Sequence, residues 1–197
     1  MKYPECSVFA TNYEFKNEKG EIKPTIINKL PFDGEDGVLS NYFEVASCSN
    51  SPLWTSAVVA KKEAFQSVGG FPLGIRAGED LLTWARLASK YEIAYFNNPL
   101  AIFNVETVHV SGKPKRIPSE IDEVSRQLLI LKKKYSPPFI NDYISLWHKM
   151  RSSIYMRLRM RKESIKEAFL GLRYNPGNYK LYFFILINLM PAKLQPF

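Results

Sequence analysis

The most informative part of this 197-residue chain is Val68-Gly-Gly-Phe71, followed after a turn by Gly78-Glu-Asp-Leu-Leu-Thr-Trp-Ala-Arg-Leu-Ala88. The glycine pair is typical of a helix end, because glycine adopts the left-handed C-cap conformation at little cost. Two acidic residues then open an amphipathic stretch that ends at a lysine, an order that suits the helix dipole. The sequence therefore predicts a short helix over 61–68 and a second helix over 79–90.

Short runs of aromatic and β-branched residues lie on both sides of this stretch and are separated by turn residues. Such runs are typical of strands. A mixed sheet with flanking helices, and hence an α/β fold, is therefore expected. The predicted strands span residues 3–15, 22–30, 54–59, 91–96 and 100–105, and a further short helix is predicted over 38–45.

Beyond residue 112 the pattern changes from mixed strands and helices to helices alone. Residues 113–118 have the composition of a basic, turn-rich linker. The predicted organisation is an α/β part over 1–112, this linker, and an all-α, basic helical tail over 119–197. The helices of the tail are expected at about 119–135, 139–161, 164–174 and 179–190.

Charge is distributed unevenly along the chain. Residues 1–110 hold 10 basic and 13 acidic side chains, a net charge of −3, whereas residues 111–197 hold 17 basic and 6 acidic ones, a net charge of +11. The C-terminal part is therefore expected to meet an anionic partner. A membrane surface, a phosphorylated ligand and a nucleic acid are the alternatives.

Composition excludes several classes of protein. With 46% apolar residues and ordinary glycine and proline content, the chain is neither disordered nor collagen-like. Its two isolated cysteines, Cys6 and Cys48, indicate neither a zinc site nor a disulfide framework and favour a reducing compartment. No secretory signal is recognisable, so a cytoplasmic protein is expected. The apolar run 181–190 is about half as long as the roughly 20 residues that a spanning helix needs.

Several short motifs follow one another in order between residues 54 and 99. They are the stretch 54–65, the Val68-Gly-Gly-Phe71 helix end, the Glu79-Asp80 pair with Arg86-Leu87 further along, and Ile93-Ala-Tyr-Phe96 with Pro99. Together they resemble the acceptor-side half of a family 2 glycosyltransferase. The resemblance covers about residues 1–110 and implies an incomplete GT-A fold. It also implies an inverting enzyme that transfers sugar from a nucleotide-sugar donor to a hydroxyl acceptor.

By this resemblance, Asp80 is the catalytic base and Glu79 is the neighbour that shapes the acceptor pocket. Sugar transfer needs a base against the acceptor hydroxyl and a means of stabilising the leaving diphosphate. The helix dipole lowers the basicity of a carboxylate at a helix start, but the hydroxyl becomes acidic as the new bond forms. The alternative is that both acids only cap and polarise the helix.

Three further residues are candidates for substrate binding: Trp54, Trp84 and Arg86. Trp84 lies one turn beyond Asp80, where it could stack on an acceptor sugar, whereas an aromatic residue on an amphipathic helix also suits a core. Arg86 could pair with a carboxylate or a phosphate, or be an ordinary surface arginine.

A complete member of the family carries an Asp-x-Asp motif that holds Mg²⁺ or Mn²⁺ against the diphosphate, and no such motif occurs in this sequence. The chain is therefore expected to be truncated and inactive by itself. Asp33-Gly-Glu35 has related spacing but is interpreted as an exposed acidic turn. His109 is a candidate metal ligand, and Lys113, Lys115 and Arg116 are candidates for binding the diphosphate. The alternatives are a solvent-facing histidine and a solvated linker.

A second hypothesis gives residues 119–197 a noncatalytic role. Basic amphipathic helices can place cations against acidic lipid, and the aromatic segment from Tyr179 suits an interfacial anchor. The protein would then be peripheral at the inner face of the membrane. A partner protein is another candidate, and a helical bundle with solvated charges is the simplest alternative. No nucleic-acid partner is expected, because no recognised binding motif occurs.

Overall fold

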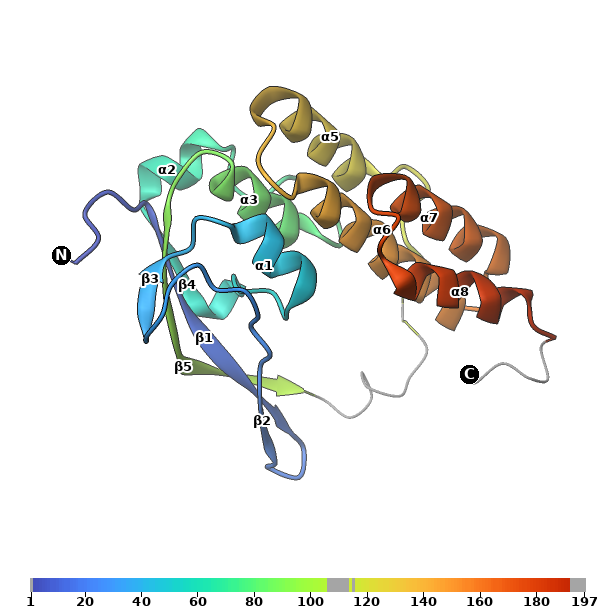
Figure 1. The fold of residues 1–197 in the computed structure, drawn as a ribbon, viewed down its shortest axis with the longest axis horizontal. Helices are drawn as coiled ribbons and strands as arrows, with labels where there is room; N and C mark the ends of the chain where they lie inside the picture. Colours follow the sequence, from blue (N-terminus) through green and yellow to red (C-terminus); the bar gives the residue numbers. More distant parts are fainter. Residues whose placement is uncertain (1, 106–113, 115, 192–197) are drawn as a thin grey trace.

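Five strands form one mixed sheet at one end of the molecule (Figure 1). The computed structural model describes residues 2–105, 114 and 116–191. The strands lie in the order β2-β1-β5-β3, and β4 also pairs with β1. Their bounds are β1 Val8–Asn17, β2 Ile22–Pro24, β3 Asp36–Val38, β4 Val58–Ala60 and β5 Ile93–Val105.

The long strands β1 and β5 are central and run parallel. β4 and β2 pair antiparallel with successive halves of β1, and β3 pairs antiparallel with β5. The predicted mixed sheet is therefore confirmed. The expected strand over 22–30 is shorter than predicted, because pairing with β1 ends at Pro24.

Strand β5 corrects the expectation of two strands separated by a turn at Pro99. β5 is continuous, but its register shifts near Pro99. Phe96 and Pro99 face consecutive residues of β1, although two residues lie between them in β5. One of them, Asn97, donates its N–H to the carbonyl of Glu35 at 2.7 Å, on the other side of the strand. A proline has no N–H for the sheet, and such an irregularity is where it is tolerated.

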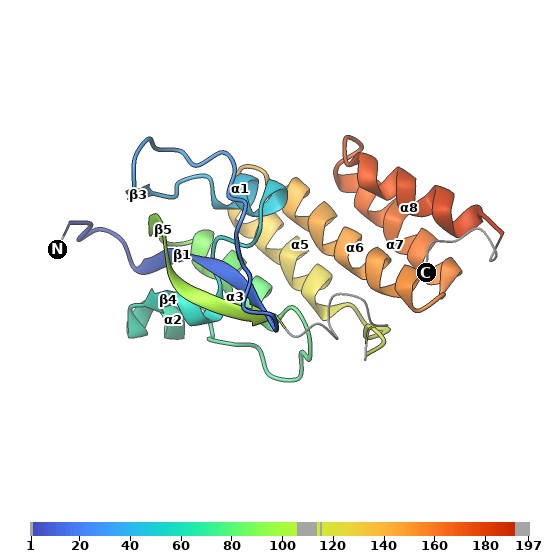
Figure 2. The ribbon, with the colours of Figure 1, turned by 90° about the horizontal axis from the view of Figure 1, so that it is seen from below.

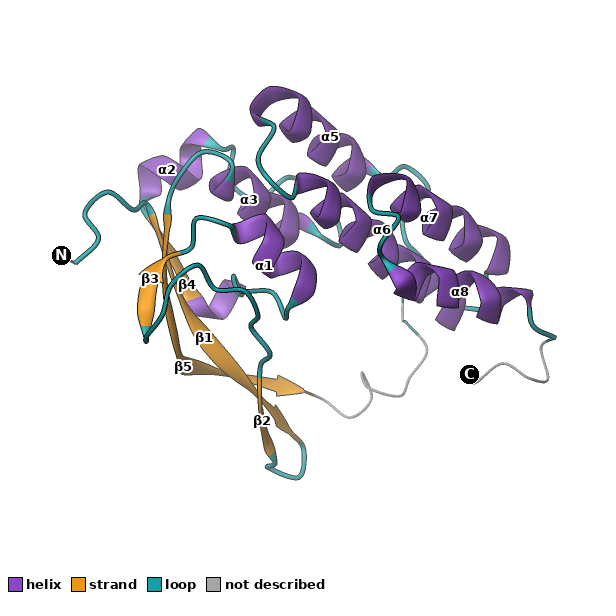
Figure 3. Ribbon diagram, in the orientation of Figure 1, coloured by secondary structure: helices purple, strands orange, loops and turns teal. Residues whose placement is uncertain are grey.

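Seven helices occur in the described part of the chain (Figure 3). The predicted helix over 38–45 begins later than expected, because Val38 pairs with Ala94 in the sheet. The helices predicted around 61–68 and 79–90, and the four in the basic tail, are confirmed within a few residues. The bounds are α1 Tyr42–Cys48, α2 Lys62–Ser67, α3 Glu79–Ala88, α5 Glu123–Tyr135, α6 Ile140–Arg157, α7 Arg161–Tyr174 and α8 Tyr179–Leu189, with a 3-10 turn η1 at Thr55–Ala57 before β4.

One hydrophobic core joins the sheet to the first two helices of the basic region. Buried side chains of the sheet, of α3, of α5 and of α6 belong to the same cluster, among them Val8, Leu87, Leu128 and Ile144. Helix α6 packs on α1, and α5 packs on α3. Figure 2 shows α7 and α8 on the side of α6 that lies away from the sheet. The division at residues 113–118 therefore marks a change of secondary structure within a continuous core.

None of the helices in the described part of the chain is both long enough and apolar enough to cross a membrane.

Candidate functional site

The Glu79-Asp80 pair forms the first turn of α3. Gly78 precedes the helix with a φ of 82°, a left-handed conformation that glycine adopts without the usual side-chain penalty. The backbone N–H of Leu81 donates to Oδ1 of Asp80 at 2.7 Å. The carboxylate is therefore held against the helix start, in the position that the sequence predicted.

The Asp80 carboxylate is half-buried and pairs with no cation among the described residues. Burial raises the pKa of Asp80 above its ordinary 3.8, and the charge of Glu79 adds to this effect. The hydrogen bond from Leu81 lowers the pKa, but its effect is smaller than that of burial. The helix start therefore lowers the pKa of Asp80 in the expected direction, but desolvation outweighs this contribution, so the net shift is upward.

Two tyrosines border this turn from other helices. Tyr143 of α6 donates its hydroxyl to the carbonyl of Leu81 at 3.0 Å, and its oxygen lies 3.3 Å from the hydroxyl of Tyr42 of α1. Since the Tyr143 proton is used, Tyr42 donates in that second contact. Burial raises the pKa of both phenols, and the charge of Asp80 adds to the shift. Two buried, uncharged phenol groups of α1 and α6 thus lie near Asp80.

The structure places Trp84 in the core. It is 3% exposed and contacts Phe71 edge-on, at 5.7 Å between ring centres. Its indole N–H has no hydrogen-bond partner in the part of the chain that the structure describes. A ring enclosed in this way has no free face for a sugar, so the suggestion of stacking by Trp84 is replaced by the core alternative.

Arg86 is half-buried on α3 rather than an ordinary surface arginine. Its guanidinium donates to the carbonyl of Val68 at 3.4 Å, so it ties α3 to the end of α2. Burial lowers the pKa of Arg86, while the charge of Glu123 on α5 raises it. Glu123 is therefore the candidate carboxylate partner of Arg86 within the protein.

Trp54 lies in an aromatic cluster on the sheet, immediately before η1. Its ring centre is 4.9 Å from that of Tyr13 and 5.0 Å from that of Phe103. Phe15 extends the cluster through Phe103 at 5.6 Å. Trp54 and both phenylalanines are half-buried, so this cluster presents partly exposed aromatic surface.

Among the residues proposed to bind the diphosphate, the structure describes Arg116. It is exposed, and its guanidinium lies 3.5 Å from the carbonyl oxygen of Arg76. His109, Lys113 and Lys115 lie outside the described residues. In the acidic turn, Asp36 is bound by the ammonium of Lys2 at 2.6 Å and by the hydroxyl of Tyr3, and these contacts lower its pKa.

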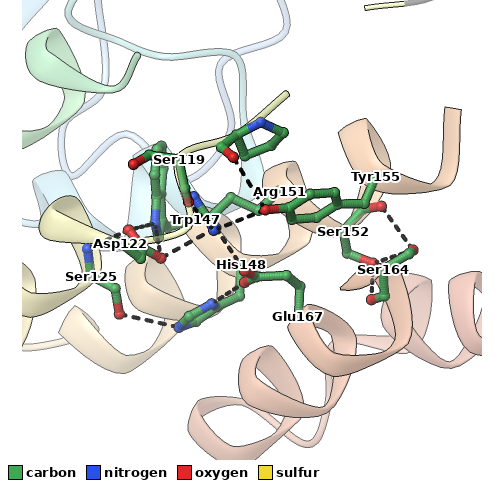
Figure 4. A network of polar contacts seen from close by, with 11 residues as sticks. Ser119, Asp122, Ser125, Trp147, His148, Arg151, Ser152, Tyr155, Ser164 and Glu167 are labelled. Carbon is green, nitrogen blue, oxygen red and sulfur yellow. Dashed lines mark hydrogen bonds and ion pairs between the residues drawn. The ribbon is translucent and has the colours of Figure 1, made fainter. Parts of the chain in front are cut away.

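A buried polar network connects α5, α6 and α7 (Figure 4), and the sequence analysis did not identify it. Arg151 of α6 lies 2.8 Å from Glu167 of α7 and 3.3 Å from Asp122, which caps α5. His148 contacts the other oxygen of Glu167 at 2.7 Å through Nδ1, and its Nε2 lies 3.4 Å from the hydroxyl of Ser125. The spacing of three residues between His148 and Arg151 places both on one face of α6 and could have indicated a polar cluster. Their acidic partners could not be identified in this way, because Asp122 and Glu167 lie far from them in the sequence.

This network does not fit a metal ion or a nucleophilic serine. Oxygen and nitrogen atoms of Asp122, His148 and Glu167 lie within 4.8 Å of one another, but the Arg151 guanidinium already pairs with both carboxylates. A serine, a histidine and a carboxylate in line can act in acyl transfer. Here, however, His148 is 3% exposed and stacks on Tyr174, so its ring is closed to a substrate.

A second group of potential ligands consists of Glu5, Cys6 and Glu92. Cys6 is fully buried, and burial raises the pKa of its thiol, as do the charges of both glutamates. A thiol must lose its proton to bind a metal. This environment opposes that loss, so the group is a poor cation site.

A surface depression of about 300 Å³ lies at the junction of α5 and α6. Its lining includes Lys132, Phe139 and Asp142 but not Asp80. Comparison of the chain with protein families, with curated proteins and with solved structures gives no match.

Proposed function

We propose that the α/β part is the acceptor side of an inverting glycosyltransferase with a GT-A-type sheet, and that Asp80 is its base. The observation that carries the proposal is the environment of the Asp80 carboxylate. It is fixed at a helix start and free of cation partners among the described residues, and burial raises its pKa. If Asp80 only capped the helix, the helix dipole would stabilise its ionised form and lower its pKa.

The proposed reaction uses Asp80 as the proton acceptor. The oxygen of the acceptor alcohol forms a bond to the anomeric carbon of the donor while the bond from that carbon to the diphosphate oxygen breaks, with inversion. The hydroxyl proton passes to the carboxylate of Asp80, whose raised pKa favours its acceptance. Glu79, half-buried in the same turn, is proposed to border the acceptor.

The donor side of the reaction is not assigned to the described residues. The divalent cation implied by the resemblance would need carboxylates that face a diphosphate. Asp36 is already paired with Lys2, and Asp122 and Glu167 are already paired with Arg151. We therefore derive no step through Mg²⁺ or Mn²⁺. Because the sequence has no Asp-x-Asp, the chain by itself is expected to transfer no sugar.

Trp54 remains the aromatic candidate for sugar contact, since Trp84 is enclosed. Partly exposed aromatic rings suit the apolar face of a sugar, and the cluster around Trp54 offers such surface. Loss of the Trp54 ring is expected to weaken glycoside binding without changing the titration of Asp80.

The proposal can be tested by carboxylate NMR on the chain labelled with ¹³C at aspartate. We expect a methyl glycoside from a panel of common hexoses to shift the Asp80 signal and to bind several-fold more weakly to Asp80→Asn. The matched control is Asp33→Asn, which alters a carboxylate in the acidic turn. A panel in which no glycoside perturbs Asp80, or equal weakening in both variants, would contradict the proposal.

A further inference from the structure

Helix α8 carries large apolar side chains on two opposite faces. On the inner face, Leu181 is fully buried against Gly171 of α7, and Asn188 donates to the hydroxyl of Ser164 at 2.9 Å. The opposite face, here called the outer stripe, is exposed to solvent. It consists of Tyr179, Tyr182, Phe183, Leu186 and Leu189, with exposed fractions of 73%, 49%, 59%, 61% and 67%.

The outer stripe occupies a single helix face, because Tyr182 and Phe183 lie three and four residues after Tyr179, and Leu186 and Leu189 follow at further steps of three. At 1.5 Å per residue it extends over about 15 Å. Five large apolar side chains exposed on one helix exceed what isolated surface residues explain. We therefore expect a lipid bilayer or another molecule to cover this face.

Exposed cations predominate on helices α7 and α8. Lys162, Lys166 and Arg173 are exposed on α7, and Lys180 is exposed on α8, whereas Glu163 is the exposed acid on these two helices. The four basic side chains have no ion-pair partner among the described residues. The surface is thus apolar and cationic, a combination that suits an anionic interface.

A further cation, Lys149 of α6, lies close enough to Lys180 for the two positive charges to act on each other. Lys149 of α6 is half-buried, and burial lowers its pKa, as does the positive charge of the nearby Lys180. An anion placed between or beside two ammonium groups that repel each other lowers their electrostatic energy. A phosphate headgroup supplies such a charge.

We propose that α8 lies in the plane of an anionic lipid bilayer, with its outer stripe among the acyl chains and the cations of α7 and α8 at the phosphates. A second copy of the chain fits less well, because a symmetric contact would bring the same cations together. Each Lys or Arg near an anionic surface increases binding by about fivefold, so four of them dominate the selectivity for acidic lipid. This inference is independent of the proposed sugar transfer.

Vesicle flotation tests the proposal with the complete chain. We expect at least about tenfold stronger binding to phosphatidylcholine vesicles containing one-third phosphatidylglycerol than to phosphatidylcholine alone, with a marked decrease at high salt. The double variant Phe183→Ser, Leu186→Ser should lose most of this binding. The matched control is Leu73→Ser, Leu100→Ser, which removes two exposed apolar side chains elsewhere (99% and 69% exposed) and should bind as the unchanged chain does.

A fluorescent variant distinguishes insertion from adsorption by charge alone. In Phe183→Trp, the added indole is expected to shift to shorter wavelength and to become shielded from an aqueous quencher when anionic vesicles are added. No preference for anionic vesicles, an unshielded indole on bound protein, or an equal loss in the control variant would overturn the proposal. So would light scattering that shows a dimer abolished by Phe183→Ser, since the outer stripe would then be covered by a second copy.

Discussion

The Nε of Arg151 and the Oε1 of Glu167 lie 2.8 Å apart, and both side chains are at least 90% buried between α6 and α7. The other Glu167 oxygen contacts His148 at 2.7 Å, and Arg151 also reaches Asp122 at 3.3 Å. The buried charges of Arg151 and Glu167 therefore each have a partner of opposite sign. The pairing fixes how the outer helices attach to the helix that packs on the α/β part.

Replacing Arg151 by Leu should destabilise the protein by about 3–5 kcal/mol, because the buried Glu167 and the half-buried Asp122 would lose their cation. Urea unfolding followed by circular dichroism gives the change in the free energy of unfolding. Arg126→Leu is the control, since it removes an ion pair with Glu123 that is exposed on α5 and should change stability little. Similar losses in the two variants would show that burial of the Arg151 pair is unimportant.

Glu167 should make the free energy of unfolding depend on acid pH. Burial raises its pKa, but the hydrogen bonds from His148 and Arg151 outweigh burial and hold the pKa below 4.5. A lowered folded-state pKa stabilises the protein above the unfolded value, and this contribution is lost as the pH falls through the folded value. Between about pH 6 and pH 3, Glu167→Gln should therefore lose less stability than the unchanged chain. A parallel decline would contradict this expectation.

Asp80 should have the opposite pH dependence. Its folded-state pKa is raised, so its contribution to stability is complete below 3.8 and is lost as the pH rises through the folded value. Asp80→Asn keeps an acceptor for the Leu81 N–H but removes the half-buried charge. We expect its melting temperature to exceed that of the unchanged chain at pH 7, with a difference that shrinks toward pH 3.5. A variant that is less stable at pH 7 would show that the carboxylate stabilises the helix.

Gly78→Ala should be more damaging than Gly74→Ala, although both glycines have a φ near 80°. The left-handed conformation alone costs an alanine about 1–2 kcal/mol, which is the expected loss at Gly74, where a Cβ meets open space. At Gly78 the new Cβ would lie 2.5 Å from the ring of Trp147, which adds an overpacking cost of about 1–3 kcal/mol. Equal losses of unfolding free energy in the two variants, measured in urea, would mean that Trp147 of α6 moves away from the new Cβ at little cost.

The two faces of α8 should respond differently to truncation. Leu181→Ala leaves a cavity against α7, so a loss of about 2–5 kcal/mol is expected. Leu186→Ala shortens an exposed side chain of the same helix and should change stability by less than about 0.5 kcal/mol. Thermal unfolding without lipid measures both. A large loss in Leu186→Ala would show that the outer stripe packs within the protein.

Local patterns identified the helices of the C-terminal region to within a few residues, because apolar spacing and helix-ending residues act over one or two turns. They also placed Glu79 and Asp80 at the start of α3. They failed where pairing in the sheet decided the structure, as at Val38, which forms a strand with Ala94, and across the irregularity before Pro99. Strand partners lie far apart in the sequence, so spacing alone does not select them.

The sequence by itself determined the mixed α/β class, the helical C-terminal region with its positive charge, and the position of Asp80 in a first helical turn. Only the tertiary structure decided that burial raises the pKa of Asp80, that Trp84 belongs to the core, and that Arg151 joins Asp122 to Glu167. The reason is physical. Helix starts and amphipathic faces depend on neighbouring residues, whereas desolvation and buried charge pairing depend on which distant surfaces fold together.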